Sequence, residues 1–338
     1  VRNLLFDFGI FKSENKNVSL LVVGNLTVGG TGKTPHVEFL LEVLHPGLRI
    51  AVLSRGYKRR SKGFILISPD TDVMVSGDEP LQLAKKFPNI PIAVCENRAV
   101  GVDKLVELHP SIDLIILDDA FQHRSLNAGF HILLTDFNHL HTRDSILPGG
   151  NLRESVKGSK RANVIIVTKC PFNLSPIDQR IIEREIKPES HQEVFFSTLQ
   201  HLPIRPLFST ESDKQLSLNS LKDHELLLVT GIVSPQPIIH ELSDKCKKLD
   251  TVNFPDHHQF SFSDLIKVEK QFNLLTGPDK LIIVTEKDAV RLINNSHLPD
   301  SIKKYIFVIP VKVQLLNDQT DVFTKKIIEY VRENKRDS

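Results

Sequence analysis

A glycine-rich stretch near the amino terminus ends in a lysine and a threonine, a combination suited to binding the phosphates of a nucleotide. The stretch reads "VGNLTVGGTGKTP" over residues 23–35. In a loop of this kind, successive backbone N–H groups converge on an anion. The Lys33 ammonium would then reach the β- and γ-phosphates, and the Thr34 hydroxyl would be a ligand of Mg²⁺. The sequence therefore predicts a site for a nucleotide and its metal ion.

The entry to this loop differs from the common phosphate-binding pattern. The pattern G-x-x-x-x-G-K-[ST] has a glycine at the position where this chain has Thr27. Later glycines let the backbone approach phosphate oxygens and adopt positive φ, namely Gly29, Gly30 and Gly32. We therefore expect the phosphate chemistry of the loop to survive the change. The alternative, a flexible turn with a helix cap, gives no reason for a lysine and a threonine at the start of the helix.

Two carboxylates follow the apolar run of "LIILDDAFQHR", residues 114–124. An acid at the end of a strand, downstream of a phosphate-binding loop, is the pattern that puts a carboxylate near the Mg²⁺ of a bound nucleotide. Asp118 ends the run directly and is the better metal candidate. Asp119 would support it or position the water shell of the metal. The alternative is that both acids are ordinary turn residues.

Two further motifs contain groups that can transfer a proton. In "SGDEPLQLAKKF", Asp78 and Glu79 open a predicted helix, either as a helix cap or as catalytic carboxylates, and the residues alone leave both open. In "NFPDHHQFS", Asp256 precedes His257 and His258 in a loop. An imidazole there can orient or activate a hydroxyl nucleophile through a carboxylate partner. Surface histidines or an incidental metal site are the alternatives.

Arginines occur in three short motifs, where their guanidinium groups suit phosphates. Arg98 lies in "CENR", Arg153 lies in "LPGGNLRE", and a basic cluster lies in "SRGYKRR", residues 54–60. The alternative is that these are solvated loop tips. In "VTEKDAVR" we expect Thr285 to cap a helix, and Lys287 is a candidate nucleotide contact.

The elements that must position these groups alternate between strand and helix. Residues 18–26 are expected to form a buried strand before the loop, and apolar residues recur at helical spacing over 33–44. Further apolar runs lie at 49–54, 91–95, 113–118, 130–136 and 162–168. Continuous rather than alternating runs are typical of parallel strands covered on both faces. We therefore predict a doubly wound α/β domain with a mostly parallel sheet.

A second, smaller α/β domain is predicted after a proline-containing linker at residues 201–209. Strand-like runs follow it at 225–231, 250–254, 280–285 and 304–310. The last element is a helix ending near Lys335. We place the nucleotide-binding core domain at 13–205 and the smaller domain at 206–338.

Composition limits the classes of partner. The chain has 338 residues, and 43 basic against 41 acidic residues give a net charge of +2. This balance does not indicate a nucleic-acid-binding protein. The three cysteines are far apart and never form C-x-x-C, which indicates a reducing compartment and no cysteine metal site. No apolar run reaches the roughly 18 residues that span a bilayer.

The first twelve residues, "VRNLLFDFGIFK", place apolar side chains on one side of a predicted helix. These side chains are Val1, Leu4, Leu5, Phe8 and Phe11. An amphipathic helix of this kind can lie on a membrane surface. A terminal helix docked on the core of the protein is the alternative, and the residues leave both open.

Eight motifs occur in one order along almost the whole chain, and together they closely resemble the tetraacyldisaccharide 4′-kinases, the lipid A kinases of Gram-negative bacteria. The motifs are "VGNLTVGGTGKTP", "SRGYKR", "GDEP", "ENR", "LDDAFQHR", "LPGGNLRE", "FPDHHQF" and "TEKDAVR". The resemblance implies ATP-dependent phosphorylation of the 4′-hydroxyl of a tetraacylated glucosamine disaccharide 1-phosphate. It also implies a two-domain protein on the cytoplasmic face of the inner membrane. We expect no obligate protein partner.

Carried over by position, the resemblance implies a role for each candidate residue. Asp78 looks like the general base and His257 looks like its partner. The ATP-binding octad would be Thr27, Val28, Gly29, Gly30, Thr31, Gly32, Lys33 and Thr34. The Mg²⁺ site would involve Thr34, Asp118, Asp119 and Glu79. Phosphate or substrate would be held by Arg98, His123 and Arg153.

Two features depart from the family pattern. Ala120 replaces the usual glycine of "DDGFQH", so the backbone there must have negative φ. The family also usually has a longer hydrophobic helix before the position of Val1, which implies that its strongest membrane anchor lies outside this sequence. The rival is a deviant P-loop ATPase switch at the membrane, which shares the "GGTGKT" ending. That class typically has a lysine where this chain has Val28, and it would not need the "FPDHHQF" loop.

Overall fold

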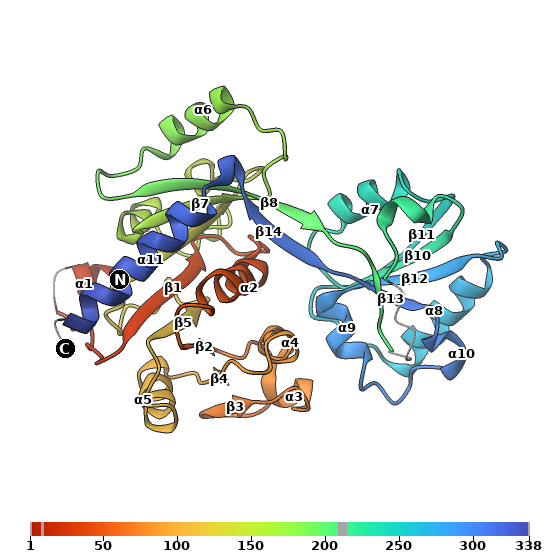
Figure 1. Cartoon of the computed structure of the whole chain (residues 1–338), viewed down its shortest axis with the longest axis horizontal. Helices are drawn as coiled ribbons and strands as arrows, with labels where there is room; N and C mark the ends of the chain where they lie inside the picture. Colours follow the sequence, from red (N-terminus) through yellow and green to blue (C-terminus); the bar gives the residue numbers. More distant parts are fainter. Residues whose placement is uncertain (1, 8–9, 209–214, 337–338) are drawn as a thin grey trace. The chain divides into compact units, whose positions relative to one another are not determined.

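Figure 1 shows the computed structural model of the chain, which divides into two compact units. The described residues are 2–7, 10–208 and 215–336. The first unit comprises Val1–Leu199 together with Val313–Ser338, and the second unit comprises Gln200–Lys312. In sequence, the second unit is therefore an insertion into the first.

A nine-stranded sheet forms the centre of the first unit within the described residues, in the order β14-β8-β7-β6-β1-β5-β2-β4-β3. The pairings from β8 through β4 are parallel, and β3 is antiparallel to β4. The strands are β1 (Ser19–Asn25), β2 (Ile50–Ser54), β3 (Ile65–Ile67), β4 (Ile92–Val94), β5 (Leu114–Asp118), β6 (Phe130–Asp136), β7 (Val164–Thr168), β8 (Glu193–His201) and β14 (Val311–Leu315). Strands β1, β2, β5 and β7 are buried along their whole length, as parallel strands covered on both faces should be. This sheet confirms the predicted doubly wound α/β fold.

Helices and short 3-10 turns connect these strands. The helices are α1 (Arg2–Asp7), α2 (Lys33–Leu44), α3 (Val73–Ser76), α4 (Asp78–Lys86), α5 (Arg98–Leu108), α6 (Pro176–Ile186) and α11 (Thr320–Arg336). The 3-10 turns are η1 (His141–Arg143), η2 (Val156–Arg161) and η4 (Leu316–Asp318). Helix α11 belongs to the core of the first unit, because Phe323 is fully buried between Phe39 and Phe195.

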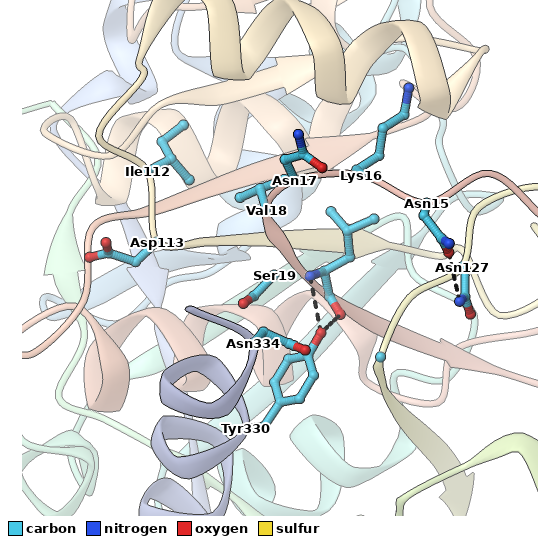
Figure 2. Close-up of a pocket in the computed structure, with 12 residues that line it drawn as sticks. Asn15, Lys16, Asn17, Val18, Ser19, Ile112, Asp113, Asn127, Tyr330 and Asn334 are labelled. Carbon is cyan, nitrogen blue, oxygen red and sulfur yellow. Dashed lines mark hydrogen bonds between the residues drawn. The ribbon is translucent and has the colours of Figure 1, made fainter. Parts of the chain in front are cut away.

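Tyr330 of α11 is hydrogen-bonded to the amino end of β1. Its hydroxyl accepts a hydrogen bond from the Leu20 N–H at 3.2 Å and donates one to the Leu20 carbonyl at 2.9 Å (Figure 2). A cavity of about 330 Å³ lies beside this contact, lined by polar side chains that include Lys16 and Asn127. The cavity therefore lies at the opposite end of β1 from the phosphate-binding loop.

The position of α11 corrects one predicted boundary. The smaller domain was expected to run over 206–338, whereas residues from Val313 onward return to the first unit. The reason is that β14 pairs with β8 at the edge of the nine-stranded sheet. This pairing joins residues far apart in sequence, and neither strand was predicted.

The second unit contains a five-stranded sheet, among the described residues, in the order β11-β10-β12-β13-β9. Its strands are β9 (Arg205–Pro206), β10 (Glu225–Thr230), β11 (Lys248–Asn253), β12 (Lys280–Thr285) and β13 (Ile306–Ile309). Its helices are α7 (Gln236–Ser243), α8 (Phe262–Asn273), α9 (Glu286–Leu292) and α10 (Asp300–Lys303), with the 3-10 turn η3 (Leu218–Leu221). All pairings are parallel except β13 with β9. The predicted smaller α/β fold is confirmed, and the predicted linker contains the end of β8 and the edge strand β9.

Candidate active site

The phosphate-binding loop joins β1 to α2, so that the loop lies at the carboxyl end of the central strand. Gly32 caps α2 with φ of 83°, and no side chain caps the helix. Gly29 has φ of 107°, and a Cβ added at Gly29 or Gly30 would meet nothing within 4 Å. A helix start with unsatisfied N–H groups and open space before it is suited to an anion.

The first half of the loop is hydrogen-bonded through its backbone to the "LPGGNLRE" motif. The Val28 N–H donates to the Asn151 carbonyl at 2.8 Å, and Thr27 forms an antiparallel bridge with Leu152. Thr27 is not among the described residues with positive φ, and this explains why a threonine is tolerated where the common pattern has glycine. The part of the loop available to phosphate is therefore Gly29 to Thr34, while contacts of Thr27 and Val28 with ATP stay a prediction.

The Lys33 side chain points into a cluster of opposite charge. Its ammonium lies 3.7 Å from Asp119 Oδ1 and 3.5 Å from Asn25 Oδ1. Arg153 Nη1 lies 3.1 Å from the same Asp119 oxygen. The predicted phosphate lysine, a predicted metal acid and a predicted substrate arginine are thus brought together.

Asp118 is the buried acid of the site. Its side chain is almost fully buried, Ser54 Oγ donates to Oδ2 at 3.2 Å, and Oδ1 is buried with no hydrogen-bond partner among the described residues. Burial raises the pKa of Asp118 to about 7. The carboxylates of Glu79 and Asp119 contribute to this raised pKa, while Lys33 and Arg98 oppose it. A buried carboxylate with an unsatisfied oxygen and acidic neighbours is suited to a cation.

The residues present fit a Mg²⁺ that is bound together with a nucleotide. The described residues contain no group of three His, Cys, Asp or Glu side chains that would hold a metal ion by themselves. This agrees with the ordinary behaviour of Mg²⁺, which takes one or two carboxylates together with substrate phosphates and waters. Thr34, the second residue of α2, is half-buried beside Lys33.

Asp78 and Glu79 occupy the first turn of α4, which directly follows Gly77 at φ of 83°. Gly77, rather than Asp78, is therefore the residue at the cap position. A Cβ on Gly77 would lie 3.0 Å from the Tyr57 carbonyl, so the "SRGYKRR" loop packs closely against the start of α4. This close approach requires glycine and fixes where the two acids begin.

The remaining predicted substrate residues differ in exposure. Arg98 is 3% exposed, and its guanidinium donates to the carbonyls of Cys95 at 2.7 Å and Asp118 at 3.2 Å. These hydrogen bonds link the carboxyl ends of β4 and β5. A contact of Arg98 with substrate stays a prediction. His123 is half-buried, with Nε2 2.9 Å from Ser125 Oγ.

Ala120 is not among the described residues with positive φ, as its methyl group requires.

In the second unit, the "FPDHHQF" loop follows β11 and contacts α9. Lys287 Nζ lies 3.0 Å from Asp256 Oδ1 and 3.1 Å from His257 Nε2. His257 has φ of 59°, a left-handed conformation that non-glycine residues adopt mainly where the surroundings enforce it. Thr285 caps α9 by accepting from the Asp288 N–H, which confirms that prediction. Lys287, a candidate nucleotide contact, lies against the loop histidine in the structure, and a contact with nucleotide stays a prediction.

Several polar residues near the loop were missed by the sequence analysis. Glu154, the neighbour of Arg153, is buried and accepts hydrogen bonds from Arg161 at 2.7 Å and Gln122 at 3.1 Å. Gln122 also donates to the Asn25 carbonyl at the end of β1. Glu154 ends the "LPGGNLRE" motif, so its place in the motif was the signal that could have identified it.

We predict that the stability of the first unit depends steeply on pH. Burial lowers the pKa of His36, His131 and His141 from 6.5 to about 4, whereas the pKa of Asp118 is raised to about 7. At pH values between about 4 and 6.5, unfolding takes up three protons at the histidines and releases one from Asp118, a net uptake of two. The free energy of unfolding should therefore fall by about 2.7 kcal/mol per pH unit as the pH is lowered from about 6 to 4.5.

Urea unfolding of the full chain across this pH range measures the slope. The matched variant His131→Gln removes one of the three histidines, so its slope should fall to about 1.4 kcal/mol per pH unit. A variant slope equal to that of the parent would contradict the assignment of a buried neutral imidazole to this position.

The fold and site define a P-loop nucleotide-binding enzyme, in which a lysine and an acidic cluster meet at the carboxyl edge of a parallel sheet. The family model of tetraacyldisaccharide-1-P 4'-kinase, LpxK, matches residues 1–332. The tetraacyldisaccharide 4'-kinase of Bacteroides thetaiotaomicron is 44% identical over 345 residues, covering 100% of this chain and 91% of that protein. The same enzyme of Flavobacterium johnsoniae is 40% identical over 337 residues, covering 99% and 93%.

A solved structure agrees with these relatives. The crystal structure of LpxK from Aquifex aeolicus in complex with ATP is 27% identical, with a TM-score of 0.71, and the match covers 98% of this chain and 93% of that one. The chain therefore belongs to the tetraacyldisaccharide-1-P 4'-kinase family. Among the described residues, none of the helices combines the length and apolar character needed to cross a membrane.

Proposed function

We propose that this chain transfers the γ-phosphoryl group of ATP to the 4′-hydroxyl of tetraacyldisaccharide 1-phosphate, giving ADP and the 4′-phosphorylated lipid A precursor. The observation that carries the proposal is the convergence at one sheet edge of a lysine-bearing phosphate loop and a buried aspartate with an unsatisfied oxygen. Phosphoryl transfer depends chiefly on positioning and on neutralising charge. Membership of the kinase family supplies the acceptor.

The proposed division of labour assigns one task to each group. The N–H groups from Gly29 to Thr34 and the Lys33 ammonium bind the β- and γ-phosphates. Asp78 accepts the proton of the sugar hydroxyl, and His257 is its proposed partner. Arg153 and His123 hold phosphate or sugar of the acceptor.

We propose that Thr34 and Asp118 would hold Mg²⁺, with Asp119 and Glu79 supporting the metal and its water shell. When bound, Mg²⁺ neutralises charge on the phosphate oxygens. The unsatisfied Oδ1 of Asp118 supports this assignment, because a nearby cation would satisfy it and would also relieve the repulsion that raises the pKa of the group.

Transfer of label from [γ-³²P]ATP to the lipid disaccharide tests the proposal. Label in the lipid, absent when the acceptor is omitted, is the expected result. The rival ATPase switch would release label as inorganic phosphate at the same rate with and without lipid. That outcome would refute the kinase function while leaving the nucleotide site in place.

The amino-terminal segment is both docked and partly exposed. Asn3 Nδ2 donates to Glu154 at 2.8 Å, and Arg124 donates to the Asn3 carbonyl at 2.9 Å. Helix α1 ends at Asp7, and Ile10 and Phe11 after it are 64% and 45% exposed. Val1 and Phe8 of the predicted apolar face lie outside the described residues. We propose that the exposed part of this segment contacts the cytoplasmic face of the inner membrane. The hydrogen bonds of Asn3 keep the segment attached to the first unit.

The double variant Ile10→Glu/Phe11→Glu should therefore bind liposomes of anionic lipid at least about tenfold more weakly than the parent, because each buried large apolar side chain contributes about 1.5–3 kcal/mol. Sedimentation with vesicles measures this. Leu274→Glu, at an exposed leucine of the second unit, is the matched control and should bind like the parent. Equal binding by all three proteins would show that residues 10 and 11 do not enter the membrane.

A further inference from the structure

Two carbonyl groups of the phosphate-binding loop are held from one side by buried side chains. The Thr31 carbonyl accepts a hydrogen bond from Thr168 Oγ1, at the end of β7, at 3.0 Å. The Gly32 carbonyl accepts one from His36 Nδ1 at 2.7 Å, in addition to the helical bond from the His36 N–H at 3.1 Å. Neither His36 nor Thr168 belongs to the catalytic and binding groups assigned above.

The hydrogen bonds of the His36 ring determine its protonation state. Because a carbonyl oxygen only accepts, Nδ1 must carry a proton. Nε2 lies 2.9 Å from Ser197 Oγ on β8 and accepts from that hydroxyl when the ring is neutral. The ring is 1% exposed, and its two nitrogens make one donor bond and one acceptor bond. This pattern of bonds is that of a neutral Nδ1–H tautomer.

Fixing these carbonyls also fixes two donors of the loop. In a planar trans peptide, the C=O and the following N–H point in opposite directions. The carbonyls of Thr31 and Gly32 point toward β7 and the His36 ring, so the N–H groups of Gly32 and Lys33 point away from them. The space around Gly29 and Gly30 is open, and the proposed phosphate site lies there.

We propose that His36, supported by Ser197, is a positioning residue that keeps the N–H groups of Gly32 and Lys33 directed at the nucleotide phosphates. An apolar residue of similar size would fill the same space but would leave the left-handed Gly32 peptide with only its helical hydrogen bond. The proposal rests on the proposed nucleotide site, and it adds a specific tautomer and a specific pair of donors.

Three substitutions at this position separate the hydrogen bond from the packing. Asn places an N–H donor near the position of Nδ1, Gln places one near the position of Nε2, and Leu has neither. Loss of one neutral hydrogen bond corresponds to about tenfold in a dissociation constant. His36→Gln and His36→Leu should therefore weaken ATP binding about tenfold, and His36→Asn should recover most of it. AMP, which lacks the β- and γ-phosphates, should bind all variants alike.

His131→Asn is the matched control. The His131 ring, on β6, is half-buried, and its burial lowers its pKa to about 4, but it packs edge-on against Phe121 rather than against the loop. This variant should lose thermal stability without losing ATP affinity. If His36→Gln and His36→Leu bind ATP as the parent does, the positioning role is wrong. If ATP affinity follows the melting temperature across all variants, including His131→Asn, the role is purely structural and the proposal is also wrong.

The nucleotide site and the His36 proposal can fail separately. If Lys33→Ala also leaves ATP affinity unchanged, the loop is not the nucleotide site and the His36 proposal falls with it. If Lys33→Ala weakens ATP binding and His36→Gln does not, the site stands and only the His36 proposal is overturned.

A measurement on the parent protein tests the tautomer directly. In the full chain labelled with ¹⁵N-histidine, the His36 ring should show a protonated Nδ1 and an unprotonated Nε2 at neutral pH. Absence of the signal in His36→Asn assigns it. An Nε2–H tautomer would overturn the proposal.

Discussion

Replacing Lys33 with alanine is expected to abolish phosphoryl transfer and to leave the fold intact. The side chain is 13% exposed, and its ammonium contacts two polar groups at the sheet edge, Asp119 and Asn25. Its loss removes a positive charge from the position where the β- and γ-phosphates bind, and a lost charge-stabilising donor typically costs about 10² to 10³ in rate. Lys33 also lowers the pKa of Asp118, so the variant has a more protonated metal acid. Both effects act in the same direction.

Single-turnover transfer of label measures the loss of phosphoryl transfer. Circular dichroism and thermal unfolding show whether the fold is intact. Lys16→Ala is a matched control, because Lys16 is also a largely buried lysine in an ion pair, with Asp103, but it lies at the opposite end of β1. Lys16→Ala should lose stability and keep the transfer rate. A folded Lys33→Ala protein with the parental rate would refute the assignment of the loop.

The central strands were predictable, and the edges of the sheet were not. Strands β1, β5 and β7 are buried on both faces, so their sequences are continuous apolar runs that stand out without any knowledge of the partner strands. Strand β14 instead contains exposed, half-buried and buried residues. Its pairing with β8 joins residues far apart in sequence, which no local pattern predicts. The wrong boundary of the second domain follows from that omission.

The acidic and basic side chains of the site were predictable for a similar reason. Parallel strands bring their carboxyl ends to one edge, so Lys33 after β1 and Asp118 at the end of β5 had to be neighbours. The groups that support the loop were not predictable. His36 lies on the buried side of α2, where most of the other residues are apolar, and its partner Ser197 is 161 residues away in sequence. A buried histidine is recognised as a hydrogen-bonding group only when its partners are known.

Asp78→Asn is expected to retain much of the ATP affinity and to lose a factor of about 10² to 10⁴ in the rate of transfer, because asparagine keeps the shape of the side chain and cannot accept the proton of the sugar hydroxyl. His257→Ala should slow the same step. His258→Ala is the matched control from the same loop, because His258 is bound to Asp264 at 2.9 Å and stacks on Phe254. That variant should lose stability of the second unit and keep the transfer step.

The double variant Asp78→Asn/His257→Ala decides whether the two residues act together. If both serve one proton transfer, the double variant should be little slower than the slower single variant, because groups that work as a unit have strongly non-additive effects. Independent roles would multiply the two losses. Single-turnover rates of the four proteins at saturating ATP distinguish these results, and saturation removes any effect on nucleotide binding from the comparison. Multiplied losses, or a His257→Ala enzyme with the parental rate, would break the proposed pair and leave Asp78 to act without the second unit's histidine.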